Sequence, residues 1–204
     1  MNGRYLNALQ ELLRPQMVRR RVVPLEDSHS GQRVPLKCHA TGLDVLVVKL
    51  DDIPRAGLSQ QDRLYPLLNP TRPDASRCCD YMLFCQREPE KDGDLFVLLA
   101  ELKRGVGGRD QVRNGYLLAR WLLAVAALHR PSVPSPRVYF RGLVFSERVD
   151  LPKQTTGRRR LRHPAPDARI VGLRVAELPS RARTGYDLDF LLNDCDEAPW
   201  RPAP

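Results

Sequence analysis

Two acidic residues and one lysine stand at the ends of neighbouring apolar segments. Asp80 comes directly before the apolar segment 81–85, and Glu101 and Lys103 come directly after the apolar segment 95–100. Carboxylate oxygens are preferred ligands of Mg²⁺, which keeps water and substrate phosphate oxygens in its other positions. Bound Mg²⁺ lowers the pKa of a water molecule and stabilises the charge of a phosphodiester transition state. These residue types therefore suit metal-dependent phosphodiester hydrolysis, in which Lys103 orients or deprotonates the attacking water or neutralises the developing charge.

A hairpin would bring the three charged groups together. Residues 80–86 and 94–103 are predicted strands, and the polar segment 88–93 between them is a predicted turn. If the strands pair symmetrically about this turn, opposed residue numbers sum to 181, so Asp80 faces Glu101 with Cβ atoms about 5 Å apart. Alternation of side chains places Lys103 on the same side. The two carboxylates would repel each other, and a divalent cation supplies the compensation, whereas a slip of one residue would separate them.

The chain resembles the PD-(D/E)xK nuclease superfamily in three places. These are the segment 79–84 (Cys-Asp-Tyr-Met-Leu-Phe), the segment 98–105 (Leu-Leu-Ala-Glu-Leu-Lys-Arg-Gly), and Asp110-Gln111 at the start of a predicted helix. The resemblance implies a restriction-endonuclease-like α/β core, in which a central mixed β-sheet is flanked by helices. It also implies a Mg²⁺-dependent nuclease, with Mn²⁺ as an alternative ion and DNA preferred over RNA. A role in bacterial defence against foreign DNA is the expected setting.

The same resemblance assigns the site residues. It implies that Asp80, Glu101, Lys103 and Gln111 are catalytic, and that Asp80, Glu101 and Leu102 form the metal set. The acidic residue that the superfamily carries on its first helix corresponds loosely to Glu11. Two departures stand beside these matches: no proline precedes Asp80, and Tyr116 follows Gln111 by five residues where one subgroup of the superfamily has four.

Other readings of the same residues remain open. Glu101 and Lys103 could form an ordinary ion pair at a strand end, with Asp80 as a turn residue. The chain could then be a catalytically weak nucleic-acid-binding subunit of a larger complex with the same fold, or a basic scaffolding protein with no chemistry. Incubation of the pure protein with plasmid, with and without Mg²⁺, separates these three functions.

The charge balance favours a polyanionic partner. The chain has 33 basic and 24 acidic residues, a formal net charge of +9, and such an excess suits nucleic acid as well as plain solubility. One site cuts one strand, so cutting of a duplex predicts a homodimer or a hetero-complex. The arginines expected to bind phosphate flank the proposed site or form the densest basic run, which could equally be a solvated loop: Arg104, Arg109 and Arg113, then Arg158, Arg159, Arg160 and Arg162.

The remaining composition argues against several other classes of protein. The five cysteines form no CxxC pair, so we expect reduced thiols and neither a disulfide framework nor a zinc site. No segment approaches the roughly 20 apolar residues of a membrane span. Residues 1–14 lack the apolar stretch of a secretory signal, so the expected location is cytoplasmic, with no membrane partner.

The expected elements form one domain over residues 1–204, with a core at about 78–177 and a polar tail at 180–204. Residues 25–33 are predicted to be a polar loop, Asp110 is the predicted N-cap of the long helix, and residues 186–192 are a possible short docking element. The order of elements predicts a mixed sheet flanked by helices. The predicted elements are a helix at 4–14, strands at 43–50, 80–86 and 94–103, a helix at 111–129, and strands at 137–145 and 169–177.

Overall fold

The computed structural model describes nine stretches of the chain. They are residues 4–22, 24–27, 31–38, 42–50, 77–87, 94–105, 107–148, 165–180 and 185–192. Among these residues, no helix has the length and apolar character that crossing a bilayer requires. The basic run at Arg158, Arg159, Arg160 and Arg162 lies outside the described residues, as does the turn at 88–93.

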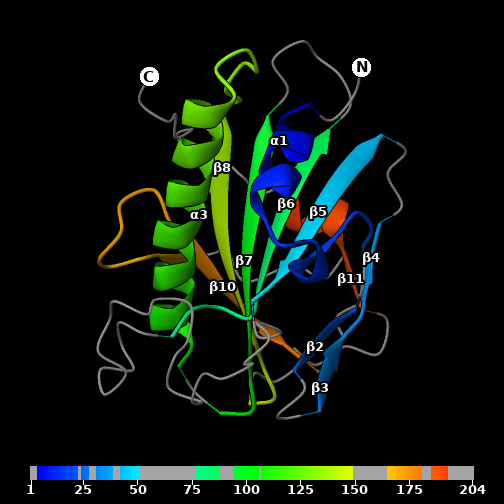
Figure 1. Cartoon of the computed structure of the whole chain (residues 1–204). Helices are drawn as coiled ribbons and strands as arrows, with labels where there is room; N and C mark the ends of the chain where they lie inside the picture. The colour runs from blue at the N-terminus through cyan, green and yellow to red at the C-terminus, as the bar shows by residue number, and fades with distance from the viewer. Residues whose placement is uncertain are drawn as a thin grey trace, which may run out of the picture.

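A mixed β-sheet forms the centre of the described structure (Figure 1). Its seven strands run in the order β1-β5-β6-β7-β8-β10-β9 among the described residues. The pairs β1–β5, β5–β6, β6–β7 and β10–β9 are antiparallel, whereas β7–β8 and β8–β10 are parallel. The strand bounds are β1 Val18–Arg19, β5 Leu43–Lys49, β6 Tyr81–Arg87, β7 Leu95–Lys103, β8 Val138–Ser146, β9 Ala165–Pro166 and β10 Arg174–Pro179.

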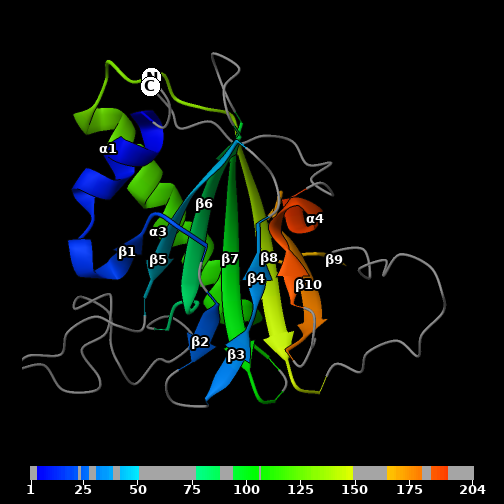
Figure 2. The ribbon, with the colours of Figure 1, turned by 90° about the vertical axis from the view of Figure 1, so that its right-hand side faces the viewer.

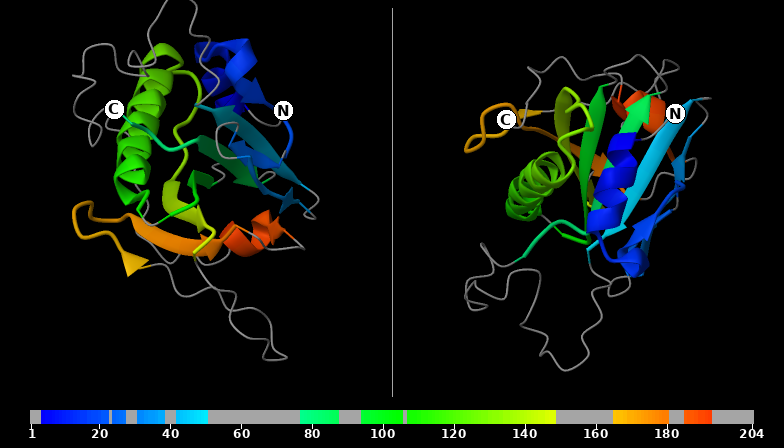
Figure 3. Two further views of the ribbon diagram at one scale, coloured as in Figure 1. Left: turned by 90° about the horizontal axis from the view of Figure 1, so that it is seen from below. Right: turned by 45° about the horizontal axis from the view of Figure 1, so that its top comes forward.

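Two helices cover one face of this sheet. Helix α1 (Arg4–Leu12) and helix α3 (Arg109–His129) lie side by side on it (Figure 3), and the Tyr5 hydroxyl of α1 donates a hydrogen bond to the Leu123 carbonyl of α3 at 3.1 Å. Burial raises the pKa of Tyr5 to about 12. Strand side chains of one parity, such as Met82 and Leu99, pack into this core. A short 3-10 helix, η1 (Pro15–Met17), follows α1.

The opposite face of the sheet is covered by small elements (Figure 2). Strand side chains of the other parity, such as Leu83 and Leu98, pack there against Leu25 and Leu191. The core therefore has two layers, one on each side of a shared sheet, and in β6 and β7 residue parity decides which layer a side chain joins. The small elements are β2 Leu25–Asp27, β3 Gln32–Val34, β4 Leu36–Lys37, β11 Tyr186–Asp187 and α4 Leu188–Leu192.

Apart from the last strand, the long predicted elements are confirmed to within two residues, and so is the register of the hairpin. Phe84 pairs with Val97 and Tyr81 with Ala100, so opposed numbers sum to 181 as expected. The coarse prediction of an α/β protein with a mixed sheet and flanking helices is confirmed by the sheet and by α1 and α3.

Several smaller predictions are wrong. The segment 25–33 contains most of the β2–β3 hairpin instead of a polar loop, because Leu25 and Val34 are fully buried. The last long strand covers 174–179 instead of 169–177. The N-cap of α3 is Gly108, and Asp110 lies in the first turn.

The tail and the core also differ from expectation. Residues 186–192 do dock, but they belong to the core and not to a polar tail, because Tyr186, Leu188 and Leu191 are buried. Residues before 78 also contribute to the hydrophobic core, since Leu6 of α1 and Leu46 of β5 are fully buried. Of the described cysteines, Cys79 and Cys85 are buried, and Cys38 and Cys78 are half-buried.

Candidate metal-dependent hydrolase site

Four neighbouring strands place a row of residues across the sheet at the end of β7. Tyr81 pairs with Ala100, which brings Asp80 beside Glu101. Glu101 pairs with Val144 of β8, and Val144 pairs with Glu177 of β10. Because Glu101 has the parity of Leu99 and Val97, which pack against the helices, its side chain points to the face of the sheet that carries α3.

Asp80 is bound to the backbone of the neighbouring strand. Its Oδ2 accepts a hydrogen bond from the Leu102 N–H at 2.7 Å, and its carbonyl accepts one from the Leu50 N–H at 2.9 Å. Its segment is also tied to α3, since the Asn114 amide donates to the Arg77 carbonyl at 2.6 Å. The carboxylate of Asp80 is therefore held in place against β7, and it is buried.

Glu101 and Lys103 form a partly buried ion pair. The Lys103 Nζ lies 2.9 Å from the Glu101 Oε1, and the two side chains are 29% and 3% exposed respectively. The carboxylate is thus almost inaccessible, whereas the ammonium reaches solvent at the edge of the sheet. The structure brings together three of the predicted catalytic residues, with the carboxylates of Asp80 and Glu101 on adjacent strands.

The N-terminus of α3 closes over this pair. Gly108 caps the helix with a φ of 100°, in the left-handed region that favours glycine. A Cβ atom on Gly108 would lie 3.0 Å from the Glu101 Cγ, 3.2 Å from the Val144 Cγ1 and 3.4 Å from the Lys103 Cγ. The first residues of the helix therefore rest directly on the site, where the positive end of the helix dipole favours negative charge.

Gln111 lies one turn into α3 on its sheet-facing side. It shares this stripe with Gly108, Val112 and Gly115, which follow the i, i+3, i+4, i+7 spacing. Val112 contacts the strand at Gly142, and Gly115 contacts Cys79, as the close approach of a Cβ atom at either glycine shows. Gln111 is half-buried in the structure, and its place on the stripe puts it near Glu101.

A buried glutamine fixes the backbone at Lys103. The Gln32 Nε2 on β3 donates hydrogen bonds to the Lys103 carbonyl and to the Ser180 Oγ, both at 2.9 Å. The Glu147 N–H also donates to the Lys103 carbonyl, at 3.2 Å. Sequence reasoning missed Gln32, and no local pattern could have found it, because 71 residues separate it from Lys103.

The Cys79 thiol lies beside the two carboxylates. It is buried and donates to the Tyr81 carbonyl at 3.4 Å. Burial raises the pKa of Cys79 well above its usual value, and the neighbouring Cys78, Glu101 and Asp80 raise it further. The thiol is therefore neutral at physiological pH and packs against Gly115 of α3.

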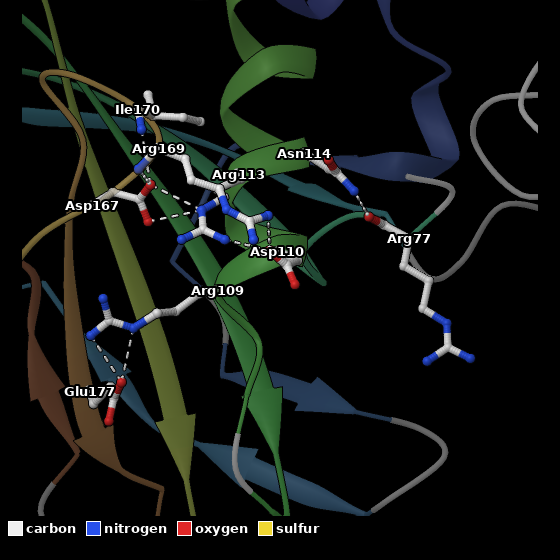
Figure 4. Close-up of polar contacts among 9 residues, drawn as sticks. All are labelled: Arg77, Arg109, Asp110, Arg113, Asn114, Asp167, Arg169, Ile170 and Glu177. Atoms are coloured by element: carbon white, nitrogen blue, oxygen red, sulfur yellow. Dashed lines mark hydrogen bonds and ion pairs between the residues drawn. The ribbon is translucent and has the colours of Figure 1, made fainter. Parts of the chain in front are cut away.

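The three predicted phosphate-binding arginines near α3 differ in exposure and in their contacts, and Figure 4 shows two of them, Arg109 and Arg113. Arg104 is exposed. The Arg109 guanidinium donates twice to the Glu177 Oε1 at 3.1 Å, and it remains about one-third exposed. Glu177 is a second residue that sequence reasoning missed, and it stands in the same row as Glu101.

Arg113 has a structural role. Its Nε donates to both carboxylate oxygens of Asp167 at 3.0 Å, and its guanidinium also pairs with Asp110. The Asp167 side chain is fully buried and also accepts from the N–H groups of Arg169 and Ile170. Burial by itself would raise the pKa of Asp167, but the hydrogen bonds from Arg113 and the backbone lower it overall. The hydrogen bond that Arg113 donates to Asp167 in turn raises the pKa of Arg113. Nucleic-acid binding by Arg113 stays a prediction.

Glu11 does not join the site. It pairs with Arg130, which follows the last residue of α3. The site lies at the first residue of that helix, and a helix of 21 residues is about 30 Å long. The loose match of Glu11 to the first-helix acid of the superfamily is therefore wrong in this structure.

The donor atoms suit a hard divalent cation. The described residues contain no group of three or more histidine, cysteine, aspartate or glutamate side chains placed to hold a metal. Mg²⁺ does not need such a group, because it commonly uses one or two carboxylates and fills its other positions with water and phosphate oxygens. Asp80 and Glu101 supply two carboxylates, and Leu102, which follows Glu101, can add only its backbone carbonyl.

Comparisons of the chain with models of protein families, with curated proteins and with solved structures found no match.

Proposed function

We propose that this protein is a Mg²⁺-dependent nuclease of the PD-(D/E)xK type that hydrolyses phosphodiester bonds, with DNA as its preferred substrate. The observation that carries the proposal is the arrangement at the end of β7, where the carboxylates of Asp80 and Glu101 lie on adjacent strands and the Lys103 ammonium is 2.9 Å from Glu101. The order α1-β5-β6-β7-α3-β8 around a mixed sheet agrees with the core that the resemblance implies.

Burial supports a chemical role over a purely structural one. Removing a carboxylate from water has a large desolvation cost, which an ion pair seldom recovers in full. A structural ion pair at a strand end would contribute about 0–1 kcal/mol if exposed, yet Glu101 is nearly inaccessible. Two buried carboxylates on adjacent strands repel each other, and a cation bound between them would offset this repulsion.

Each residue has a distinct part in the proposed reaction. Asp80 and Glu101 would hold the metal, with the Leu102 carbonyl as a further ligand, and Mg²⁺ would supply a water of lowered pKa and positive charge for the transition state. Lys103 orients or deprotonates the attacking water or neutralises the developing phosphate charge. Gln111, half-buried on the stripe of α3 that faces the site, is the candidate to orient the same water. Arg104 and Arg109 extend the positive surface beside the site toward the substrate backbone.

Plasmid cleavage tests the proposal. Pure protein should convert supercoiled plasmid to nicked or linear plasmid in the presence of Mg²⁺ and should leave it supercoiled in EDTA. Asp80→Asn should abolish cleavage, whereas the matched control Asp94→Asn should not, because Asp94 lies by the opposite end of β7 in an ion pair with Arg137. Plasmid binding without cleavage would indicate a nucleic-acid-binding subunit instead of a nuclease. The absence of both binding and cleavage would indicate a scaffolding protein.

A further inference from the structure

The outer face of α3 is apolar. Of the helix residues from 111 to 128, all of which the structure describes, the exposed ones are Leu117, Trp121, Ala124 and Leu128. Leu117 is 57% exposed, Trp121 61% and Leu128 74%. These four residues are called the α3 stripe below. The side of a surface helix that faces solvent is normally polar, so the middle of α3 is apolar on both of its sides, while Asp110 and His129 near its two ends are exposed and polar.

Such a stripe indicates a protein interface. Single exposed apolar residues are ordinary on protein surfaces, but a contiguous apolar patch marks an interaction site. Tryptophan is enriched among the residues that dominate binding energy at interfaces. The residues of the α3 stripe are separated by four, three and four positions, which is the a/d spacing of helices that pack against each other.

We propose that the α3 stripe is the interface of a homodimer in which the α3 helices of two copies pack antiparallel about a two-fold axis. With the axis between residues 122 and 123, opposed residue numbers sum to 245. Leu117 of one copy then faces Leu128 of the other, and Trp121 faces Ala124. The largest side chain of the stripe meets the smallest, twice, so the stripe is complementary to itself in shape.

The charges beside the stripe permit this pairing. In the register that sums to 245, Arg120 faces Val125 and Arg113 faces Ser132, so no like charges stand directly opposite each other. The Arg120 guanidinium already lies over the Tyr116 ring of its own helix, 5.5 Å from the ring centroid.

The apolar area suits a weak dimer. Applied to side chains of ordinary size, the exposed fractions of the three large residues correspond to roughly 350 Å² of apolar surface per copy. A standard interface buries about 800 Å² per partner, so flanking half-buried residues of α3 must supply the rest. We therefore expect a dissociation constant of roughly micromolar size.

The dimer is independent of the proposed nuclease chemistry. Each candidate site lies at the N-terminus of its α3, about 14 residues from the two-fold axis, so the two sites would stand roughly 40 Å apart along the paired helices. Dimerisation along α3 would therefore leave both sites open, and it would hold even if the chain cleaved nothing.

Sedimentation velocity between 1 and 200 μM tests the interface. Wild-type protein should pass from monomer to dimer over this range, and Trp121→Glu should raise the dissociation constant at least roughly 100-fold. The matched control is Val171→Glu, because Val171 is 98% exposed and lies off the helix, and it should dimerise as wild type does. A wild-type monomer at 200 μM would overturn the proposal, and so would an undisturbed Trp121→Glu dimer.

A charge pair tests the antiparallel register. Leu117→Glu alone and Leu128→Lys alone should each weaken the dimer. The double variant should recover affinity, because the carboxylate at 117 of one copy would face the ammonium at 128 of the other. Parallel helices would instead oppose like charges, so a double variant weaker than either single variant would contradict the register.

Discussion

Gly108→Ala tests whether the N-terminus of α3 positions the site. Gly108 has a φ of 100°, and a Cβ atom placed there would approach the Glu101 Cγ to 3.0 Å and the Val144 Cγ1 to 3.2 Å. Contacts this short require the neighbouring side chains to move by a few tenths of an ångström. Gly107 is the matched control, since it also has a φ of 100° but has nothing within 4 Å of its added Cβ atom.

The two effects of the substitution have different sizes. A non-glycine residue in this backbone conformation costs about 1–3 kcal/mol, and for a chain of this length that corresponds to a loss of about 2–12 °C in melting temperature. Both alanine variants should show this loss. Moving a catalytic group by about 1 Å can cost on the order of 100-fold in rate, so a shift of a few tenths of an ångström at Glu101 should cost roughly tenfold in Gly108→Ala alone.

The assay is single-turnover cleavage of a labelled oligonucleotide duplex with saturating Mg²⁺, measured at least 15 °C below the lower of the two melting temperatures. Gly108→Ala should cleave roughly ten times more slowly than Gly107→Ala at similar stability. Equal rates for the two variants would refute the inference that Gly108 controls the position of Glu101. A slower Gly107→Ala would show that backbone strain, and not contact with Glu101, sets the rate.

Three further changes extend the test. Lys103→Arg keeps the positive charge but changes the shape of the side chain and removes its capacity to give up a proton near neutral pH. The melting temperature and the affinity for nucleic acid should stay unchanged, while the cleavage rate falls by on the order of 100-fold. Cleavage at the wild-type rate would mean that Lys103 only forms an ion pair with Glu101. Gln32→Leu removes one of two donors to the Lys103 carbonyl, which should lower the unfolding free energy measured by urea titration by about 0.5–1.5 kcal/mol and slow cleavage. Unchanged stability would argue against the contact. Asp167→Asn breaks the buried pair with Arg113, at a cost of about 3 kcal/mol near pH 7. The folded-state pKa of Asp167 is lowered. The difference in unfolding free energy between wild type and Asp167→Asn is therefore fully present above the unfolded pKa of about 3.9 and should shrink as the pH falls below that value. A difference that does not depend on pH would contradict an ionised Asp167 paired with Arg113.

The hairpin that builds the site could be predicted from the sequence because its physics is local. Two apolar strands flank one polar turn, and a buried sheet tolerates no slip, since a shift of one residue would turn every side chain to the other face. The observed pairing of Phe84 with Val97 confirms that reasoning. The long helix and the other strands of at least seven residues were predictable for the same reason, since each has a periodic pattern that a single segment reveals.

The elements that surround the hairpin depend on distant contacts. Strands β2 and β3 have three residues each, too few for a pattern, and Gln32 is important only because Lys103 lies beside it in space. The close approach of Gly108 to Glu101 follows from the path of α3 over the sheet, which no local pattern reveals. Strand β10 begins later than predicted because Asp167 binds Arg113, and the residues that follow Asp167 form a turn before Leu173.

The most direct measurement is the anomalous scattering of Mn²⁺ in crystals of the protein. The proposal predicts one ion with a carboxylate oxygen of Asp80 and one of Glu101 each about 2.0–2.3 Å away, and loss of that peak in Glu101→Gln. The bound ion would then compete with the Lys103 ammonium for the Glu101 oxygen, and the distance between Lys103 Nζ and Glu101 Oε1 would increase from 2.9 Å. A saturating soak that leaves this ion pair intact and shows no anomalous peak between the two carboxylates would contradict the assignment of a metal-dependent nuclease.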